Sequence, residues 1–199
     1  DLSRIESGRL ELDPAPCSLR ALVDEVATLE TPLAAAQHVG LAVAIDDDVP
    51  EWVHVDALRL RQVLLNLVNN ALKFTTKGHV ELQLKRAAPG ERTLEFIVRD
   101  TGPGMSPEML ARLFQRFEQG SERRHGSSGL GLAISQRIVV LMGGELDVRS
   151  ELGRGSTFTV RVPLAPCPPP EVVAPRADPP SPSNVKLDLL VVEDDPATR

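Results

Sequence analysis

Three polar side chains line one stripe of an otherwise apolar stretch, 64-LLNLVNNALKF-74. Each residue of a helix turns by about 100°, so Asn66, Asn70 and Lys73 fall on one narrow line. The amide oxygen of asparagine is a neutral, hard ligand that suits magnesium, and lysine supplies positive charge for phosphate. The stripe therefore indicates a site for a metal-bound phosphate. Surface asparagines on an amphipathic helix are the alternative.

An acid precedes a glycine pair in 100-DTGPGM-105, where a strand is expected to end. Gly102 and Gly104 let the backbone approach a planar ligand closely. An ionised Asp100 accepts hydrogen bonds and donates none. It would bind the 6-amino group of adenine and be left unpaired by the oxygen of guanine. An unpaired buried acceptor costs about 1–3 kcal/mol, which predicts selection of ATP over GTP. A simple strand-ending turn is the alternative.

The segment 126-GSSGLGLAIS-135 places Gly129 and Gly131 directly before a predicted helix. It lacks the Gly-Lys-Ser/Thr ending of a Walker loop, and its glycine spacing is not that of the dinucleotide-binding fingerprint. Free N–H groups and the helix dipole favour an anion at this place. A glycine-rich lead-in without a ligand is an equal alternative.

A polar and basic loop lies between the two glycine segments, in 113-LFQRFEQGSERRH-125. Phe114 and Phe117 are three residues apart on a short amphipathic helix and are expected to pack in a satellite core. Arg123 and Arg124 indicate a lid that becomes ordered when phosphates pair with its arginines. A solvated run of charges is the alternative.

The remaining pattern predicts the elements that hold these segments in place. Helices are expected at 1–12, 18–37, 57–75, 107–117 and 132–142, and strands at 41–46, 52–55, 79–86, 93–100, 145–150 and 156–164. Ser18 and Asp56 are predicted N-caps, and Gly40 is expected to end the second helix. The apolar face of 57–75 is expected in the core through Leu60, Leu64, Leu67, Ala71 and Phe74. Helices that flank one sheet of antiparallel hairpins give an α+β two-layer sandwich.

Composition limits the functions that the chain can have. The 199 residues are 42% hydrophobic and 25% charged, as in globular domains. The net charge of −6 argues against a nucleic-acid surface. Cys17 and Cys167 have no Cys or His cluster beside them, which disfavours a zinc site or a disulfide and favours a reducing cytoplasm. No apolar run approaches the length that crosses a bilayer, so no direct membrane contact is expected.

In their order along the chain, these segments resemble the N, G1, F and G2 boxes of sensor histidine kinases, over roughly residues 18–164. The resemblance implies the ATP-binding sandwich, or Bergerat fold, that is shared with type II topoisomerases, heat-shock chaperones and mismatch-repair ATPases. It also implies ATP and Mg²⁺ as ligands. The chain departs from the family in reading Gly-Ser-Ser-Gly in place of Gly-Gly-Thr-Gly, and its lid is a few residues shorter than in hybrid kinases.

The resemblance implies a role for each residue that matches a box. Asn70 would be the magnesium ligand and Asp100 the adenine reader. Asn66 and Lys73, taken as the catalytic pair, would contact the phosphates or the metal's waters. The other residues expected to bind the nucleotide or to shape its pocket and lid are Gly102, Gly104, Phe117, Arg123, Gly126, Gly129, Leu130, Gly131 and Thr157.

Asn66 distinguishes two activities within this fold. In the ATP-hydrolysing relatives, the position four residues before the magnesium asparagine is a glutamate that activates water. An amide cannot act as a general base. The resemblance thus implies a protein-histidine kinase, which passes the γ-phosphoryl group to a histidine by positioning and metal electrostatics. An ATPase of the same fold and a non-catalytic nucleotide-sensing module are the alternatives.

The acceptor histidine is expected outside the chain. The family's acceptor stands beside an acid on an upstream helix, a setting that is not found at His38, His54, His79 or His125. Residues 1–12 resemble the end of the second helix of the dimerisation domain that bears the acceptor, and 13–165 are expected to form the catalytic domain. A proline-rich linker is expected at 166–184.

Residues 185–199 resemble the start of a receiver domain, with Glu193 and Asp194 as acids of its metal pocket. The chain is therefore expected to be an excised, monomeric piece of a homodimeric hybrid histidine kinase. Its expected partners are ATP, the dimerisation domain, and a receiver domain or response regulator. The expected location is the cytoplasm, and an anchor of the parent in the inner membrane is left open.

Overall fold

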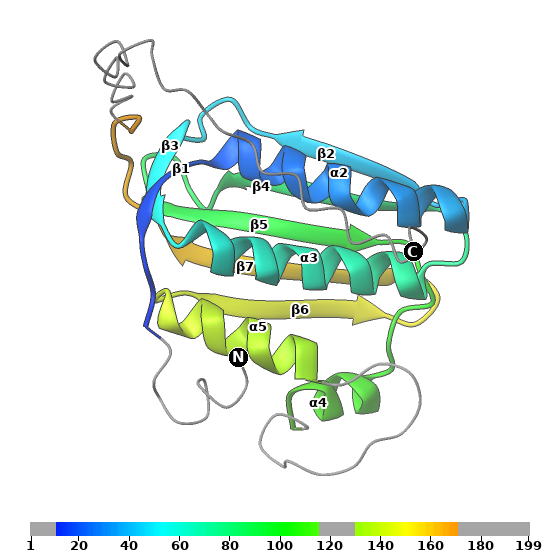
Figure 1. The fold of residues 1–199 in the computed structure, drawn as a ribbon. Helices are drawn as coiled ribbons and strands as arrows, with labels where there is room; N and C mark the ends of the chain where they lie inside the picture. The colour runs from blue at the N-terminus through cyan, green and yellow to red at the C-terminus, as the bar shows by residue number, and fades with distance from the viewer. Residues whose placement is uncertain (1–10, 116–129, 171–199) are drawn as a thin grey trace, which may run out of the picture. The chain divides into compact units, whose positions relative to one another are not determined.

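Five strands form the main sheet of the computed structural model, which describes residues 11–115 and 130–170 (Figure 1). Their order across the sheet is β2-β4-β5-β7-β6. The expected hairpin of β4 and β5 is confirmed, and β6 and β7 form a second antiparallel pair. β2 lies parallel to β4, because the chain between them passes through a helix and crosses over. The strands are β2 (Gly40–Ile45), β4 (His79–Arg86), β5 (Thr93–Asp100), β6 (Glu145–Glu151) and β7 (Gly155–Pro163).

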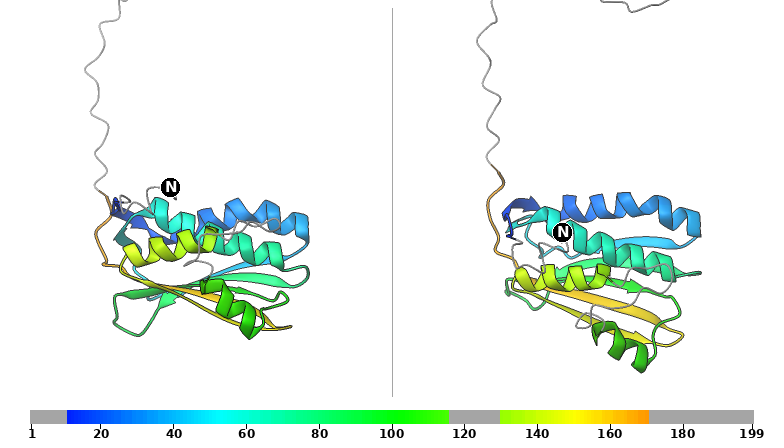
Figure 2. Two further views of the ribbon diagram at one scale, coloured as in Figure 1. Left: turned by 90° about the horizontal axis from the view of Figure 1, so that it is seen from below. Right: turned by 60° about the horizontal axis from the view of Figure 1, so that its bottom comes forward.

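Helices cover one face of this sheet, and the views in Figure 2 show the two layers edge-on. The covering helices are α2 (Leu19–Gln37), α3 (Ala57–Phe74) and α5 (Leu130–Leu141). A shorter helix, α4 (Pro107–Gln115), follows β5 in the chain. The α+β two-layer sandwich is thus confirmed.

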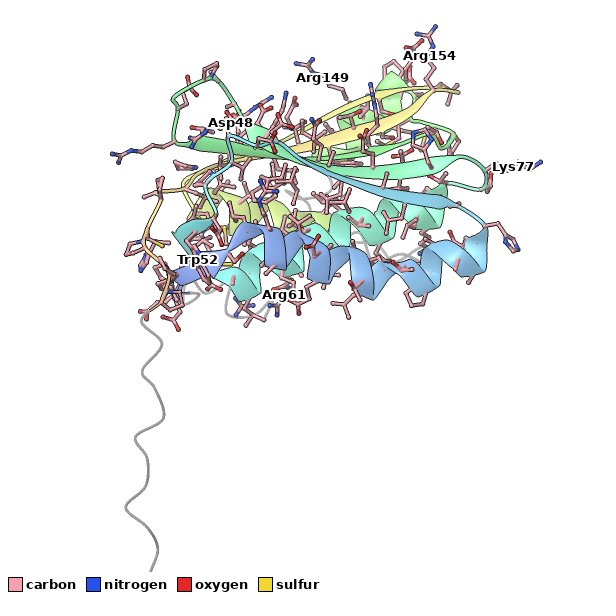
Figure 3. All side chains as sticks on the ribbon, turned by 90° about the horizontal axis from the view of Figure 1, so that it is seen from above. Asp48, Trp52, Arg61, Lys77, Arg149 and Arg154 are labelled. Carbon is pink, nitrogen blue, oxygen red and sulfur yellow. The ribbon has the colours of Figure 1, made fainter. Side chains whose placement is uncertain are left out.

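Strand alternation separates the buried face of the sheet from the open one. On β5, Leu94, Phe96 and Val98 are fully buried beneath the helices, while the residues between them reach the other side. Figure 3 shows Arg149 and Arg154 on the side of the sheet away from the helices. The core also includes Leu22, Val26, Leu60, Leu64, Leu67, Ile138, Val80, Leu82, Val160 and Val162.

Both predicted helix N-caps are confirmed. Ser18 Oγ accepts a hydrogen bond from the N–H of Ala21, and Asp56 Oδ1 accepts one from the N–H of Arg59 at 3.0 Å. The prediction that Gly40 ends the second helix is wrong. His38 ends it in a left-handed conformation (φ 56°), and Gly40 begins β2.

The prediction that Phe74 joins the core is also wrong. Phe74 is 52% exposed, because it is the last residue of α3, and the buried residue at this end is Thr75. The helix predicted from residue 132 begins two residues earlier, at Leu130. Within the described ranges, no helix is both long and apolar enough to cross a membrane.

A small second sheet holds the segments by which the chain enters and leaves the domain. Its first strand was not predicted from the sequence. β1 (Ala15–Ser18) pairs antiparallel with β3 (Trp52–Val55). On the other edge of β3, His54 N–H donates to Ala165 O at 3.1 Å, and Cys167 N–H donates to Trp52 O at 3.0 Å. Both ends of the described unit therefore lie against β3.

Candidate active site

A hydrogen-bonded network joins the polar stripe of α3 to α5. Asn66 Nδ2 donates to Ser135 Oγ at 2.9 Å, and Asn70 Nδ2 donates to Asn66 Oδ1 at 3.3 Å. Ser135 is only 1% exposed. Asn70 uses its Nδ2 group in this network, so Oδ1 is the atom of its amide that could serve as a ligand of a cation.

Gly131 packs directly on the same network. A Cβ at this position would overlap Asn66 Oδ1, so a side chain there would displace the amide. Gly131 belongs to the first turn of α5, where free N–H groups and the helix dipole favour an anion. The structure therefore brings the glycine segment and the start of the α3 stripe together.

Gly102 lies against the other end of the stripe. A Cβ on Gly102 would stand 3.2 Å from Phe74 O and 3.3 Å from Thr75 Oγ1, where α3 ends. Lys73 is exposed at this end, and its Nζ lies 5.9 Å from the centre of the Phe74 ring. The two glycine segments thus approach opposite ends of the polar line from Asn66 to Lys73.

Asp100 is buried at the end of β5, with 6% exposure. Its Oδ1 accepts from the N–H of Gly102 at 2.8 Å and from the N–H of Ser156 at 3.3 Å. Burial raises the pKa of the Asp100 carboxyl above its ordinary 3.8, and the hydrogen bonds from Gly102 and Ser156 lower the pKa in part. Both backbone donors use the same oxygen, Oδ1, and the Ser156 hydroxyl also acts on the carboxyl.

Ser156, not Thr157, accompanies Asp100. The register pairs Asp100 with Ser156 across β5 and β7, and Ser156 is buried on the helical side. Thr157 pairs with Arg99 and reaches the open face of the sheet. The structure therefore separates Thr157 from Asp100, because adjacent residues of a strand point to opposite faces.

Gly104 holds the turn after Asp100 against the β6–β7 hairpin. Its φ is +66°, and a Cβ there would overlap the carbonyl oxygen of Glu151. The next residue, Met105, donates its N–H to Ser150 Oγ at 2.8 Å, and Ser150 Oγ lies 3.0 Å from Ser156 Oγ. Hydroxyl groups thus connect the turn to the neighbourhood of Asp100.

Several predicted residues lie outside the description. Phe117, Arg123, Gly126 and Gly129 fall between residues 116 and 129, which are not described, and so does the expected lid. Leu130 is the first residue of α5, and only its backbone is described. The expected roles of these five residues stay predictions.

Two residues of the site were missed by sequence reasoning. Ser156 had a usable signal, because Phe158 and Val160 are apolar and the same alternation turns Ser156 toward the helices. Ser135 had none, since its contact with Asn66 depends on how α3 and α5 pack and joins residues 69 positions apart.

The donor set limits the kind of metal that the site can hold. Across residues 11–115 and 130–170, no group of three or more His, Cys, Asp or Glu side chains converges as metal ligands. An amide oxygen suits a hard cation that keeps water and phosphate oxygens around it. The stripe of α3 therefore fits magnesium delivered with a phosphate ligand, and it does not fit a transition metal bound by the protein alone.

Comparison with known proteins gives a consistent family. A family model described as histidine kinase-, DNA gyrase B-, and HSP90-like ATPase matches residues 55–166. The signal transduction histidine-protein kinase BarA of Escherichia coli (strain K12) is 41% identical over 169 residues, which are 82% of this chain and 18% of BarA. The sensory/regulatory protein RpfC of Xanthomonas campestris pv. campestris is 39% identical over 171 residues, which are 83% of this chain and 24% of RpfC. The chain spans about a fifth of the length of these relatives.

Solved structures have the same architecture. Full-length ShkA in complex with AMPPNP matches with a TM-score of 0.72 at 38% identity, over 83% of this chain and 34% of that chain. The nucleotide-free catalytic domain of histidine kinase ThkA matches with a TM-score of 0.65 at 23% identity, over 76% of this chain and 95% of that chain, which supports the fold alone. The chain therefore belongs to the family of histidine kinase-, DNA gyrase B- and HSP90-like ATPases.

Proposed function

We propose that the chain binds ATP with Mg²⁺ on the helical side of the sheet and donates the γ-phosphoryl group to a histidine on a separate dimerisation domain. One observation supports this most. The polar stripe of α3 runs between Gly131, which packs on Asn66, and Gly102, which binds the buried Asp100. ShkA, which was solved with the ATP analogue AMPPNP and is 38% identical, supports an adenine nucleotide as the ligand.

Asp100 would select adenine. Gly102 and Ser156 bind Oδ1 through their N–H groups, which fixes the plane of the carboxylate. Oδ2 would accept the 6-amino group of adenine, a donor that guanine lacks at this position. An unpaired carboxylate costs about 1–3 kcal/mol or more, so GTP would bind at least about fivefold more weakly than ATP.

Asn70 would hold the cation through Oδ1. Ser135 and Asn66 orient it, because each amide nitrogen donates to the next oxygen in the line. Lys73 and the N-terminal turn of α5 would supply positive charge to the phosphates. Bound magnesium would neutralise charge on the triphosphate during transfer.

Asn66 favours transfer over hydrolysis. Its Oδ1 and Nδ2 are both engaged within the network, and an amide has no basic site to take a proton from water. The acceptor imidazole nitrogen would form the new bond to phosphorus as the bond to the β-phosphate oxygen breaks and ADP leaves. The residues of this chain would orient the two reacting groups.

The test combines the chain with a separately made dimerisation domain that contains the acceptor histidine. With ATP and Mg²⁺, acid-labile phosphate should form on that domain. Asn70→Ala should abolish transfer, whereas His38→Gln, at the exposed C-cap of α2, should not. Transfer by the Asn70→Ala chain at the normal rate would contradict the role of Asn70. Rapid release of phosphate with no transfer would instead favour the ATPase.

A further inference from the structure

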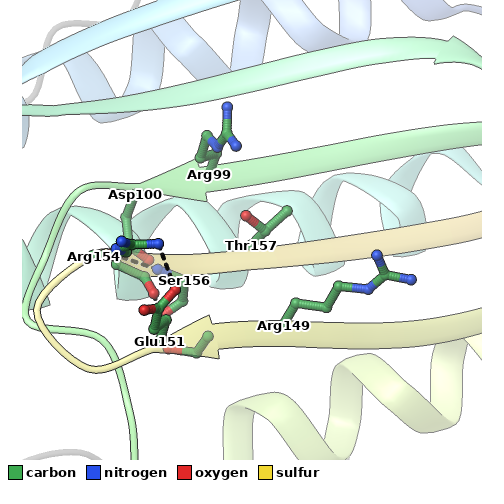
Figure 4. A pocket seen from close by; sticks show the side chains of 9 residues that line it. Arg99, Asp100, Arg149, Glu151, Arg154, Ser156 and Thr157 are labelled. Atoms are coloured by element: carbon green, nitrogen blue, oxygen red, sulfur yellow. Dashed lines mark hydrogen bonds and ion pairs between the residues drawn. The ribbon is translucent and has the colours of Figure 1, made fainter.

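A basic hollow lies on the open face of the sheet, and Asp100 and Ser156 of the candidate nucleotide site also border it (Figure 4). Its volume is about 420 Å³. Arg99 of β5, Thr157 of β7 and Arg149 of β6 contribute to its lining, and Arg154 reaches it from the β6–β7 turn. Such a volume falls within the range of small-molecule sites, roughly 300–1,000 Å³.

Strand register brings two of these arginines to either side of one hydroxyl group. Thr157 pairs with Arg99 on β5 and with Arg149 on β6. Neighbouring strands are about 4.8 Å apart, so the two arginine backbones are about 10 Å apart with Thr157 between them. Guanidinium groups at the ends of these long side chains can therefore close on one anion above Thr157.

Arg161, the next arginine on the same face, is neutralised by acidic side chains on the neighbouring strands. Arg161 donates to Glu95 Oε1 at 2.7 Å and to Glu145 Oε1 at 2.9 Å, from the strands on both sides. Across β5, β7 and β6, this arginine thus stands between two acids. The row of the hollow reads arginine, threonine, arginine, and no acid stands between the two cations.

The acids near the hollow leave its positive charge largely in place. The side chain of Arg99 makes no ion pair or hydrogen bond with any described residue, although Glu81 is its neighbour on β4. Arg149 lies 3.7 Å from Asp147, and its side chain is 85% exposed. Arg154 pairs with Glu151 at 3.0 Å, but both side chains are exposed, and such pairs are weak. Three cations thus line the hollow with two acids, Glu151 and Asp100, and the Asp100 side chain is turned to the helical side, in a chain whose net charge is −6.

We propose that this hollow binds the phosphate group of a phosphorylated small molecule through the arginine–threonine–arginine row on the open face, next to the site proposed for ATP. The planar guanidinium group binds phosphate through paired hydrogen bonds, and the Thr157 hydroxyl donates a further one. Asp100 and Ser156 also line the hollow, so it adjoins the proposed adenine site at this end of β5 and β7, whereas Arg99, Arg149 and Thr157 point to the open face. The hollow does not depend on the function proposed for the helical face.

The test uses pyrophosphate without Mg²⁺ as the probe and follows the backbone amide signals of the full chain by NMR. Pyrophosphate should shift the signals of Arg99, Arg149 and Thr157 saturably. Arg99→Gln and Arg149→Gln should each weaken this binding about tenfold, because each removes one charge-assisted pair. Arg161→Gln is the matched control and should leave the affinity unchanged. Lys85 still pairs with Glu95 in that variant, which supports the fold.

Three results would overturn the proposal. Shifts confined to Asn66 and Gly131 would show that pyrophosphate binds only the helical face. Equal weakening by all three arginine substitutions would show unspecific attraction to positive charge. Sedimentation of the chain with vesicles that contain phosphatidic acid, abolished by Arg99→Gln, would assign the hollow to a lipid headgroup and not to a small molecule.

Discussion

Asn66 donates from Nδ2 to Ser135 Oγ at 2.9 Å, across the contact between α3 and α5. This bond fixes which end of the Asn66 amide meets Asn70. Ser135 thus acts as a positioning residue for the proposed metal ligand. It is also buried, so the bond is shielded from competing water.

Replacing Ser135 tests that positioning role. Ser135→Ala should lower the rate constant of phosphoryl transfer about two- to tenfold, because one buried hydrogen bond contributes about 0.5–1.5 kcal/mol and its loss frees the Asn66 amide. KM for ATP should change less than kcat, since Asp100 still holds the base. Ser135→Thr retains the hydroxyl and should restore most of the rate. Equal rates for the Ala variant and the wild type would remove Ser135 from the mechanism.

A carboxylate at position 66 should convert transfer into hydrolysis. Asn66→Glu supplies the general base that the amide lacks, and general bases contribute about 10²–10⁴-fold. Phosphate release from ATP, measured without an acceptor domain, should rise at least about tenfold. Asn66→Gln, which has the same length without the charge, is the matched control and should not hydrolyse ATP faster. If the two variants behave alike, the identity of residue 66 does not decide the outcome.

The proposed adenine contact predicts a selective loss in Asp100→Asn. The amide oxygen can still accept from Gly102 and Ser156, so the fold should persist. Its NH₂ group would face the 6-amino group of adenine, donor against donor. ATP affinity in a calorimetric titration should fall about 10–100-fold, for a loss of about 1–3 kcal/mol. GTP affinity should fall less, and an unchanged affinity for ATP would place the base elsewhere.

On acidification, ATP binding should weaken at a higher pH than it would if Asp100 had the pKa of an ordinary aspartate. Burial raises the pKa of Asp100 above 3.8, so the acceptor becomes protonated sooner on acidification. The effect of acid on the free energy of unfolding has the opposite sign. A group whose pKa is raised in the folded state stabilises the fold fully below its unfolded pKa, and this contribution is lost as pH rises through the folded pKa. Relative to Asp100→Asn, the wild-type free energy of unfolding should therefore increase as pH falls through that window.

Ser156 and Thr157 form a matched pair for assigning the two faces of β7. Ser156→Ala should weaken ATP binding by a few-fold, because the hydroxyl beside Asp100 no longer helps to keep the carboxyl ionised. Thr157→Val should leave ATP binding unchanged, since its side chain faces the open side. The reverse pattern, measured by the same titration, would restore the original expectation for Thr157.

Much of this fold could be predicted from hydrophobic periodicity. The alternation in 79–86 and 93–100 predicted a hairpin, and the register confirms it. The stripe of Asn66 and Asn70 followed from helix geometry alone. The predictions that failed concerned the ends of helices and strands or contacts that arise from packing. The exposure of Phe74 depends on where α3 stops, and β1 was hidden by the prolines at 14 and 16.

The candidate site was predicted less completely than the fold. The expectation for Thr157 came from a family resemblance, whereas alternation in the same strand favours Ser156. A one-residue difference in a strand reverses the face, so motif matching without the strand pattern is unsafe at such positions. The contact between Asn66 and Ser135 lies beyond local reasoning, because it arises from the packing of two helices.

The short strand Trp52–Val55 binds the incoming segment along one edge and the outgoing segment along the other. A force on either of these two segments would therefore act on this strand. From there it could reach the other segment without crossing the polar stripe of α3. The segments that enter and leave the domain are thus both attached to the same strand, β3. A displacement of the chain at residue 15 or at residue 167 is therefore expected to act on β3 as well as on the element that adjoins it in the chain.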